Sequence, residues 1–198
     1  DLSTLEVWNS NFVALAADIA QARMSHLSSI MPMVNDNYGH LAGGHSVSAS
    51  YLPKGYALGE ASPSRADIAL LIDEALVQHR SEEFDRGLSL IGPQRDDVEL
   101  LIAGKPARSH ASQGETWSLA LALRLATAAW LRQERPSGDP IIMLDDVFAE
   151  LDAQRRARLV EIIRDYQQIV ITSAVEEDVP SELTGQIFDV SQGVVSPR

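Results

Sequence analysis

The stretch that most constrains the fold is the apolar run Ile141–Leu144, which leads directly into Asp145 and Asp146. Four consecutive apolar residues are typical of a strand buried on both faces, as in the parallel sheets of α/β proteins. Such a strand brings the two carboxylates to its carboxyl end, where they can ligate a metal ion and position water in phosphoryl transfer. Taken alone, the pattern is better explained by acids that only cap the following turn.

A second motif lies upstream, at residues 111–115, directly before a long segment rich in Ala and Leu. Ser112, Gln113 and Gly114 at a helix start place a hydroxyl and free backbone N–H groups on the positive end of the helix dipole, where phosphate binds. Ser112 followed three residues later by Glu115 is also the pattern of a plain capping box. The two motifs in this order, about thirty residues apart, are more specific than either alone.

Composition excludes several classes of protein. The net charge of the 198-residue chain is −12, and the parts before and after Gly87 each carry −6, so no basic tail marks a self-sufficient nucleic-acid binder. No apolar run is long enough to cross a bilayer, and the N-terminus lacks the pattern of a signal peptide. The absence of cysteine excludes thiolate metal sites and is compatible with a cytoplasmic protein, and the five histidines lack metal-ligand spacing.

The first 87 residues predict a small α-rich unit. A helix with an apolar stripe that includes Trp8 begins at Leu2, and we expect it to end before Pro32 with Trp8 in the core. The elements expected next are a turn-rich stretch (35–44), a strand (47–52) and a helix (64–85) that begins with a capping box. The sequence has no heptad repeat sustained over several repeats, so a long coiled coil is excluded.

The pattern changes at Gly87, and strands then alternate with helices. This alternation predicts an α/β fold with a mainly parallel sheet. The expected elements are strands (88–91, 98–102), a hairpin-like turn (103–106), a helix (113–132), a loop (135–140), strands (141–146, 168–173), and two last strands (186–190, 194–195) that close the sheet edge. A helix that begins at Asp152 lies between 141–146 and 168–173. The outward face of this helix carries four arginines, Arg155, Arg156, Arg158 and Arg164. We expect them to be solvated and to form ion pairs with Asp152, Glu161 and Asp165, and we favour this over contacts with DNA.

On these residues the chain resembles the SMC-type ATPases and, within them, the RecF-like family of recombination and repair proteins. Residues 111–115 look like the ABC signature loop, 141–146 look like Walker B, and 150–152 look like the D-loop. Residues 92–97 narrow the resemblance to the RecF-like family. It covers essentially the whole chain and is strongest from Gly92 to Ser173.

The resemblance implies an architecture and a set of cofactors. Residues 88–198 would be the C-terminal lobe of an ABC-type ATPase head, and residues 1–87 a short SMC-like arm subdomain. Two heads would sandwich two ATP molecules, with Asp145 on Mg²⁺ and Asp146 as the catalytic residue that orients water. Ser112, Gln113, Gly114 and Glu115 would contact the ATP of the opposite subunit, and Asp152 would contact the partner.

One pair of residues departs from the family pattern, and one turn has a role that the sequence alone does not reveal. Thr172 and Ser173 stand where ABC ATPases usually carry a switch histidine, so slow hydrolysis is expected. The turn at 92–97 contains Gln94 where relatives often have histidine. In that turn, Arg95 is expected to bridge to phosphate or to a neighbouring carboxylate, with Asp96 and Asp97 as the nearest partners.

No Gly-x-x-x-x-Gly-Lys-Ser/Thr motif occurs in the sequence. In the family this P-loop belongs to the N-terminal lobe, so the resemblance implies a C-terminal fragment that does not hydrolyse ATP alone. For the intact protein it implies an ATP-dependent homodimer that binds gapped DNA or junctions of single and double strands. It also implies recombination mediator proteins as partners, recombinase loading, and no membrane.

Two other function classes stay open at this point. The chain can be a structural module whose acidic helical arm docks a protein partner, with the Walker B-like strand merely folded. It can also be a metal-dependent hydrolase that uses Asp145 and Asp146. The hydrolase is less favoured, because no histidine or distant carboxylate cluster offers the remaining ligands.

Overall fold

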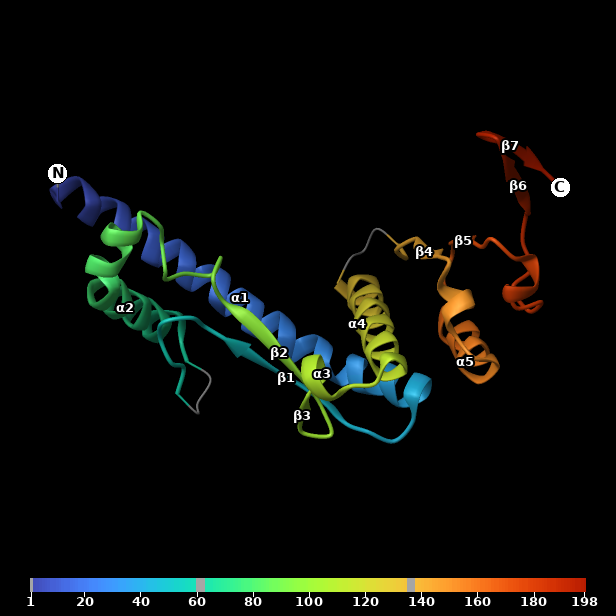
Figure 1. The fold of residues 1–198 in the computed structure, drawn as a ribbon, viewed down its shortest axis with the longest axis horizontal. Helices are drawn as coiled ribbons and strands as arrows, with labels where there is room; N and C mark the ends of the chain where they lie inside the picture. The colour runs from blue at the N-terminus through green and yellow to red at the C-terminus, as the bar shows by residue number, and fades with distance from the viewer. Residues whose placement is uncertain (1, 60–62, 135–137) are drawn as a thin grey trace.

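The computed structural model describes residues 2–59, 63–134 and 138–198, so residues 135–137 of the expected loop lie outside the described residues. The α/β class predicted from the sequence is confirmed. Figure 1 shows a long helix with a second helix beside its N-terminal half and further helices and strands around its C-terminal end. The elements are, in order, α1 (Leu2–Ala42), β1 (Val47–Leu52), α2 (Arg65–Arg86), β2 (Asp97–Ile102), β3 (Lys105–Pro106), α3 (Ala107–His110), α4 (Gln113–Glu134), β4 (Ile142–Asp145), η1 (Val147–Glu150), α5 (Ala153–Ile163), β5 (Ile169–Thr172), η2 (Glu176–Asp178), β6 (Phe188–Ser191) and β7 (Val194–Pro197).

Helix α1 does not end at Pro32, and the turns expected at 35–44 are wrong, because the helix continues through Pro32 to Ala42. Pro32 itself is exposed, so its ring and its missing N–H face solvent. The residues around it bury one stripe at steps of three and four. Burial of that stripe outweighs the loss of a single main-chain hydrogen bond. The buried residues of the stripe are Ile30, Val34, Tyr38 and Leu41.

The N-terminal half of α1 packs against α2 in a separate small core. The apolar face predicted for α2 is confirmed, and its capping box is present, with Ser64 and Asp67 bonded to each other's main chain. The expected burial of Trp8 is wrong, since this side chain is 68% exposed. Small residues on another face of α1 let α2 approach closely there. Because two faces of α1 carry apolar residues, the sequence did not show which of them is buried. The buried residues are Val13, Ala16, Ala17 and Ala20 on α1, and Ile68, Ile72, Ala75 and Leu76 on α2.

The strand expected at 88–91 is also absent from the structure. The N–H groups of Leu90 and Ile91 donate to Oε1 of Glu83, at 2.6 and 3.3 Å. Ile91 is 1% exposed and packs into the core between α1 and α2. This apolar segment therefore runs on from the end of α2. The Glu83 carboxylate accepts the N–H groups that a neighbouring strand would otherwise bond.

Strands β1, β2 and β3 form an antiparallel sheet beside α1. β1 pairs with β2 from Val47 opposite Ile102 to Leu52 opposite Asp97. β2 turns back into β3 through Ala103 and Gly104, both at positive φ, which confirms the predicted hairpin. Because β1 and β2 lie on opposite sides of Gly87, this sheet crosses the expected division of the chain. That division stays a prediction.

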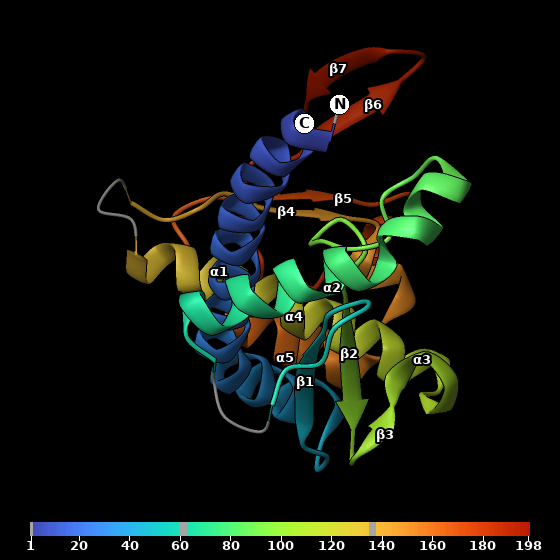
Figure 2. The ribbon, with the colours of Figure 1, turned by 90° about the vertical axis from the view of Figure 1, so that its left-hand side faces the viewer.

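Strands β4 and β5 are parallel, as predicted, and pack on the main core with α4, α5 and the C-terminal half of α1. The last two strands do not close the edge of this sheet, which corrects the expectation. β6 and β7 pair with each other through Gln192 and Gly193, both at positive φ. Figure 2 shows this hairpin away from the adjacent β4 and β5. Within the described ranges, none of the helices has the length and apolarity to cross a bilayer.

Two glycines near the end of α1 give a matched test of this helix boundary. Gly39 is helical, and a Cβ at this position would meet no atom within 4 Å. Gly39→Ala should therefore raise the free energy of unfolding by about 0.5–1 kcal/mol. Gly43 is equally open but has φ +76°, so Gly43→Ala should lower stability by about 1 kcal/mol. Urea unfolding measures both, and stabilisation by Gly43→Ala would contradict the boundary at Ala42.

Candidate functional site

The parallel pairing of β4 and β5 brings together residues far apart in the sequence. Asp145 and Thr172 are register partners at the carboxyl ends of the two strands. The Thr172 hydroxyl donates to the Asp145 carboxylate. The N–H of Asp146 donates to the carbonyl oxygen of Thr172 at 3.2 Å and lies 3.3 Å from its Oγ. Ser173 follows directly and its hydroxyl donates to the Val175 carbonyl at 2.7 Å.

Asp146 has the backbone conformation that ends the strand. Its φ of 52° and ψ of 19° are left-handed, a region that Asp tolerates better than most residues. Its carboxylate accepts the N–H of Ala174 at 3.3 Å. This bond ties the turn after β4 to the turn after β5, and both Asp145 and Asp146 remain exposed to solvent.

The donors at this edge fit a Mg²⁺ ion shared with phosphates. Mg²⁺ in phosphoryl-transfer sites is usually held by one or two carboxylates together with substrate oxygens and water. Asp145 supplies such a carboxylate, oriented by Thr172. Across the described residues, no group of three or more His, Cys, Asp or Glu side chains gathers into a metal cage.

The residues of the signature-like loop form the N-terminus of α4. The N–H and hydroxyl of Ser112 both donate to Oε2 of Glu115, at 2.8 and 2.7 Å, and the N–H of Glu115 reaches Ser112 Oγ at 3.3 Å. This is the capping box that the sequence allowed. The two bonds from Ser112 lower the pKa of Glu115, and the positive charge of Arg155 lowers it further.

Arg155 connects the signature-like loop to the D-loop-like turn. Asp152 caps α5 by accepting the Arg155 N–H at 2.9 Å, and its Oδ2 lies 3.4 Å from Arg155 Nη1. The same guanidinium covers Gly114, where an added Cβ would lie 3.0 Å from Nη1. The pairing of Asp152 with Arg155 was predicted. The contact with Gly114 was not, because a glycine gives no sequence signal for what packs over it.

Tyr38 lies behind this loop and was not predicted as part of the site. Its side chain is fully buried, and within the described residues its hydroxyl has no hydrogen-bond partner. Burial and the negative charge of Glu115 raise the pKa of Tyr38, while Arg155 partly opposes them. The sequence did not indicate that Tyr38 is buried, because this residue falls in a stretch expected to form turns.

The other arginines of α5 are paired within the chain. Arg156 Nη2 lies 2.9 Å from Asp178 Oδ1, and Arg164 lies 3.7 Å from Asp165. Arg158 reaches the Leu41 carbonyl at 3.5 Å. The predicted partners Asp152 and Asp165 are thus confirmed for Arg155 and Arg164, whereas Arg156 pairs with Asp178 of η2 and not with an acid of its own helix. The preference for a solvated face over contacts with DNA stays a prediction.

The turn at 92–97 has a structural role that the sequence did not predict. Asp96 accepts the hydroxyls of Tyr51 and Tyr56 and the N–H of Lys54, which ties the start of β2 to the exit of β1. Burial and the hydrogen bond to Asp96 raise the pKa of Tyr51 to about 12.

The expected pairing of Arg95 with Asp96 or Asp97 is wrong. Arg95 Nε donates to the Ser89 carbonyl at 2.8 Å, because Asp96 is taken up by the tyrosines of β1 and its exit loop. Asp97 lies 4.0 Å from Arg108. Gln94 donates to the Ile91 carbonyl at 3.0 Å. Thus Gln94, Arg95 and Asp96 each have a partner that shapes the turn or its flanks, whereas Asp97 is exposed.

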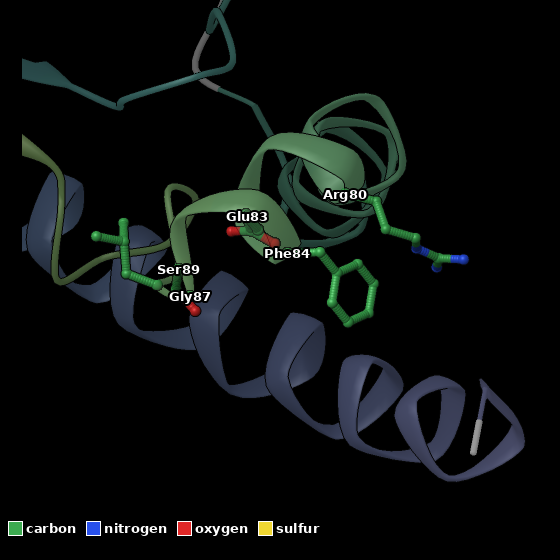
Figure 3. Close-up of a pocket in the computed structure, with 6 residues that line it drawn as sticks. Arg80, Glu83, Phe84, Gly87 and Ser89 are labelled. Atoms are coloured by element: carbon green, nitrogen blue, oxygen red, sulfur yellow. The ribbon is translucent and has the colours of Figure 1, made fainter.

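A shallow pocket of about 310 Å³ at the end of α2 contains none of these residues. Figure 3 shows Phe84 and Arg80 projecting from α2 beside α1. The pocket is open, and its lining carries no constellation of acid, base or nucleophile. The residues that the sequence predicted for ATP and Mg²⁺ lie instead at the ends of β4 and β5 and at the start of α4.

The Asp96 contacts predict a difference between two adjacent acids. Asp96→Asn replaces an acceptor of three hydrogen bonds and should lower the free energy of unfolding by about 1.5–3 kcal/mol. Asp97→Asn is the matched control, because Asp97 is 74% exposed and should change stability by less than about 0.5 kcal/mol. Urea unfolding measures both, and equal effects would show that Asp96 does not hold the turn.

The capping box predicts a pH dependence. Because the folded-state pKa of Glu115 is lowered, its carboxylate stabilises the fold above its ordinary pKa of 4.5, and this contribution is lost as pH falls through the lowered value. Between pH 6 and pH 3 the wild type should therefore lose more stability than Glu115→Gln. NMR titration of the Glu115 carboxyl carbon gives the pKa directly. Ser112→Ala should raise it, and an unchanged pKa in that variant would contradict the capping geometry.

Comparison with known proteins identifies similar sequences and similar folds. The family profile described as SbcC/RAD50-like, Walker B motif, matches residues 103–165. Two solved structures of the recombination mediator protein RecF in the RecFOR pathway, one with ATPrS and one with ATP, are similar to the chain with a TM-score of 0.83 each. Their identities are 22% and 21%, and the matches cover 100% and 99% of this chain and 51% and 50% of theirs. At these identities the likeness concerns the fold.

Sequence relatives carry the family assignment. The DNA replication and repair protein RecF of Streptomyces avermitilis is 42% identical over 196 residues, which are 98% of this chain and 51% of the relative. The protein of the same description from Frankia alni is 43% identical over 199 residues, 98% of this chain and 52% of the relative. The chain thus spans about half the length of the curated relatives it matches. Over the length that it spans, the chain belongs to the RecF family.

Proposed function

We propose that the chain supplies one part of each of two composite ATP sites in a RecF-like DNA-repair ATPase. The observation that carries the proposal is the shared edge of β4 and β5, where Asp145, Asp146, Thr172 and Ser173 meet. In α/β sheets, ligands bind outside the carboxyl ends of parallel strands, which is where these residues lie. The ATP-bound RecF structures have the same fold, which supports the proposal.

Each residue of this edge has a proposed role. Asp145 would hold Mg²⁺, with Thr172 fixing the carboxylate. The metal ion would neutralise charge on the phosphate oxygens. Asp146 would orient or deprotonate the attacking water. Thr172 and Ser173 offer hydroxyls and no imidazole, so they can hydrogen-bond water but cannot switch by charging, and turnover would be slow.

The start of α4 would act on the ATP held by the opposite subunit. Ser112, Gln113 and Gly114 present a hydroxyl and main-chain N–H groups at a helix N-terminus, a place that suits phosphate. The Ser112 hydroxyl is engaged by Glu115, so it would have to exchange this bond for one to the γ-phosphate. Asp152, held by Arg155, would contact the partner across the interface.

The remaining proposals concern the longer protein. Because the sequence has no P-loop, the chain would not hydrolyse ATP alone. ATP binding would drive homodimerisation, since each subunit provides only part of each pocket. Residues 1–87 would be the arm and 88–198 the lobe of the ATPase head. The dimer would act in the cytoplasm on gapped or junction DNA, with recombination mediator proteins, to help load recombinase.

A chimaera tests this function. Joining the chain to the remainder of the Streptomyces avermitilis relative would supply the P-loop, and light scattering would report dimerisation with ATP. The wild-type chimaera should dimerise, whereas Ser112→Arg should bind ATP and stay monomeric, because the larger cation blocks the α4 N-terminus. Ser81→Arg on α2 adds the same charge at another exposed position and should dimerise normally.

The same experiment separates the alternatives. If Ser112→Arg and Ser81→Arg both dimerise like the wild type, the signature-like loop does not meet the nucleotide in trans. Dimerisation without ATP would favour a structural interaction module over an ATPase. If ATP does not bind to the wild-type chimaera, the proposed function fails.

A further inference from the structure

Arg155 lies between the first turns of two helices. It belongs to the first turn of α5, and its guanidinium lies over Gly114 in the first turn of α4. Both helices pack against α1. The N-terminal ends of helices are the positive ends of their dipoles, so this place is unfavourable for a cation. The stability of α5 alone therefore gives no reason for an arginine here.

Arg155 holds both carboxylate oxygens of Asp152. Oδ1 accepts the main-chain N–H of Arg155 at 2.9 Å, and Oδ2 lies 3.4 Å from Nη1 of the same residue. Among the residues that the structure describes, no other carboxylate lies within 4 Å of this guanidinium. The Asp152 side chain is 58% exposed, whereas that of Arg155 is only 27% exposed. The half-buried cation thus orients a carboxylate at the surface.

Gly114 provides the space on the other side of the guanidinium. An added Cβ at this position would lie 3.0 Å from Nη1 and 3.2 Å from Nη2 of Arg155. Gly114 lies in α4, and its φ is not among the positive values that require glycine. Alanine is the better helix former. The close approach of Arg155 is therefore the reason that the fold gives for a glycine at this position.

We propose that Arg155 is a positioning residue that holds the start of α4 and the turn before α5 as one unit, so that both meet the opposite subunit together. This role rests on the proposed function, because it deepens the parts given there to Ser112, Gly114 and Asp152. Arg155 would act through Gly114 and Asp152 and would not touch the nucleotide. Its loss would weaken dimerisation and leave unchanged how each subunit binds ATP at its own P-loop.

NMR of the 198-residue chain tests the contact without nucleotide. Gly114→Ala adds a methyl group that must displace the guanidinium, so it should shift the signal of the Asp152 carboxyl carbon. In the Arg155→Gln background the same substitution should leave that signal in place. Gly39→Ala is the matched control, because it also replaces a helical glycine but its Cβ would meet no atom within 4 Å. It should leave the signal unchanged in both backgrounds.

The chimaera with the remainder of the Streptomyces avermitilis relative tests the role in dimerisation. Arg155→Gln should weaken ATP-dependent dimerisation at least about tenfold and leave unchanged the affinity for ATP at concentrations too low for dimers. Arg164→Gln removes the same charge from the residue that ends α5, which pairs with Asp165, and should dimerise like the wild type.

A double variant distinguishes positioning from direct contact with phosphate. If Arg155 acts through Asp152, the combined effect of Asp152→Ala and Arg155→Gln should be at least about threefold smaller than the product of the two single effects. A residue that contacted the phosphate itself would give the full product, because the two side chains would then act on different groups.

The outcomes separate this role from the proposed function. If Gly114→Ala leaves the Asp152 signal in place, or shifts it equally in both backgrounds, Arg155 does not couple the two loops. If the wild-type chimaera dimerises with ATP, but Arg155→Gln behaves like Arg164→Gln or its effect multiplies with that of Asp152→Ala, the positioning role is wrong and the proposed function stands. If the wild-type chimaera does not dimerise with ATP, the proposed function fails and this role fails with it.

Discussion

The pairing of β4 with β5 is the constraint on which the candidate site depends. Side chains alternate along a strand, so the burial of Ile142 and Leu144 in the main core fixes which face Asp145 occupies. Parallel register then places Asp145 beside Thr172. A slip of one residue would turn the carboxylate into the core. The apolar packing therefore determines the position of the acids, and the hydrogen bonds between the turns refine it.

Helix α1 links the main core to the small core that it shares with α2. Its C-terminal half contributes to the main core and buries Tyr38 behind the signature-like loop, while its N-terminal half forms a second core with α2. Asn35 of the same helix fixes the start of β1 by accepting the N–H of Val47. One continuous helix is thus a rigid connection between the arm-like part and the candidate site.

Local features such as strands and helix caps were predicted well from the sequence, whereas features that depend on packing between distant elements were not. The capping boxes and the strand near 141–146 rest on nearest-neighbour patterns and are confirmed, the strand as Ile142–Asp145. The burial of this strand on both faces, expected from its apolar run, is wrong, because Ile142 and Leu144 are buried whereas Met143 is 76% exposed. Pro32 was taken as a helix end because its cost is local, whereas the burial that offsets it comes from distant elements. The predicted burial of Trp8 was wrong because two faces of α1 are apolar. The role of Asp96 depends on tyrosines about 40 residues away.

Trans-complementation of ATP hydrolysis would decide most directly whether the β4–β5 edge and the α4 N-terminus serve different nucleotides. Two chimaeras are mixed, one with Asp145→Asn and one with Ser112→Arg, each inactive alone. If Ser112 acts in trans, a mixed dimer keeps one intact site, and the mixture should recover ATPase activity that neither variant shows alone. A mixture that stays inactive although mixed dimers form would show that Asp145 and Ser112 belong to one site in one subunit.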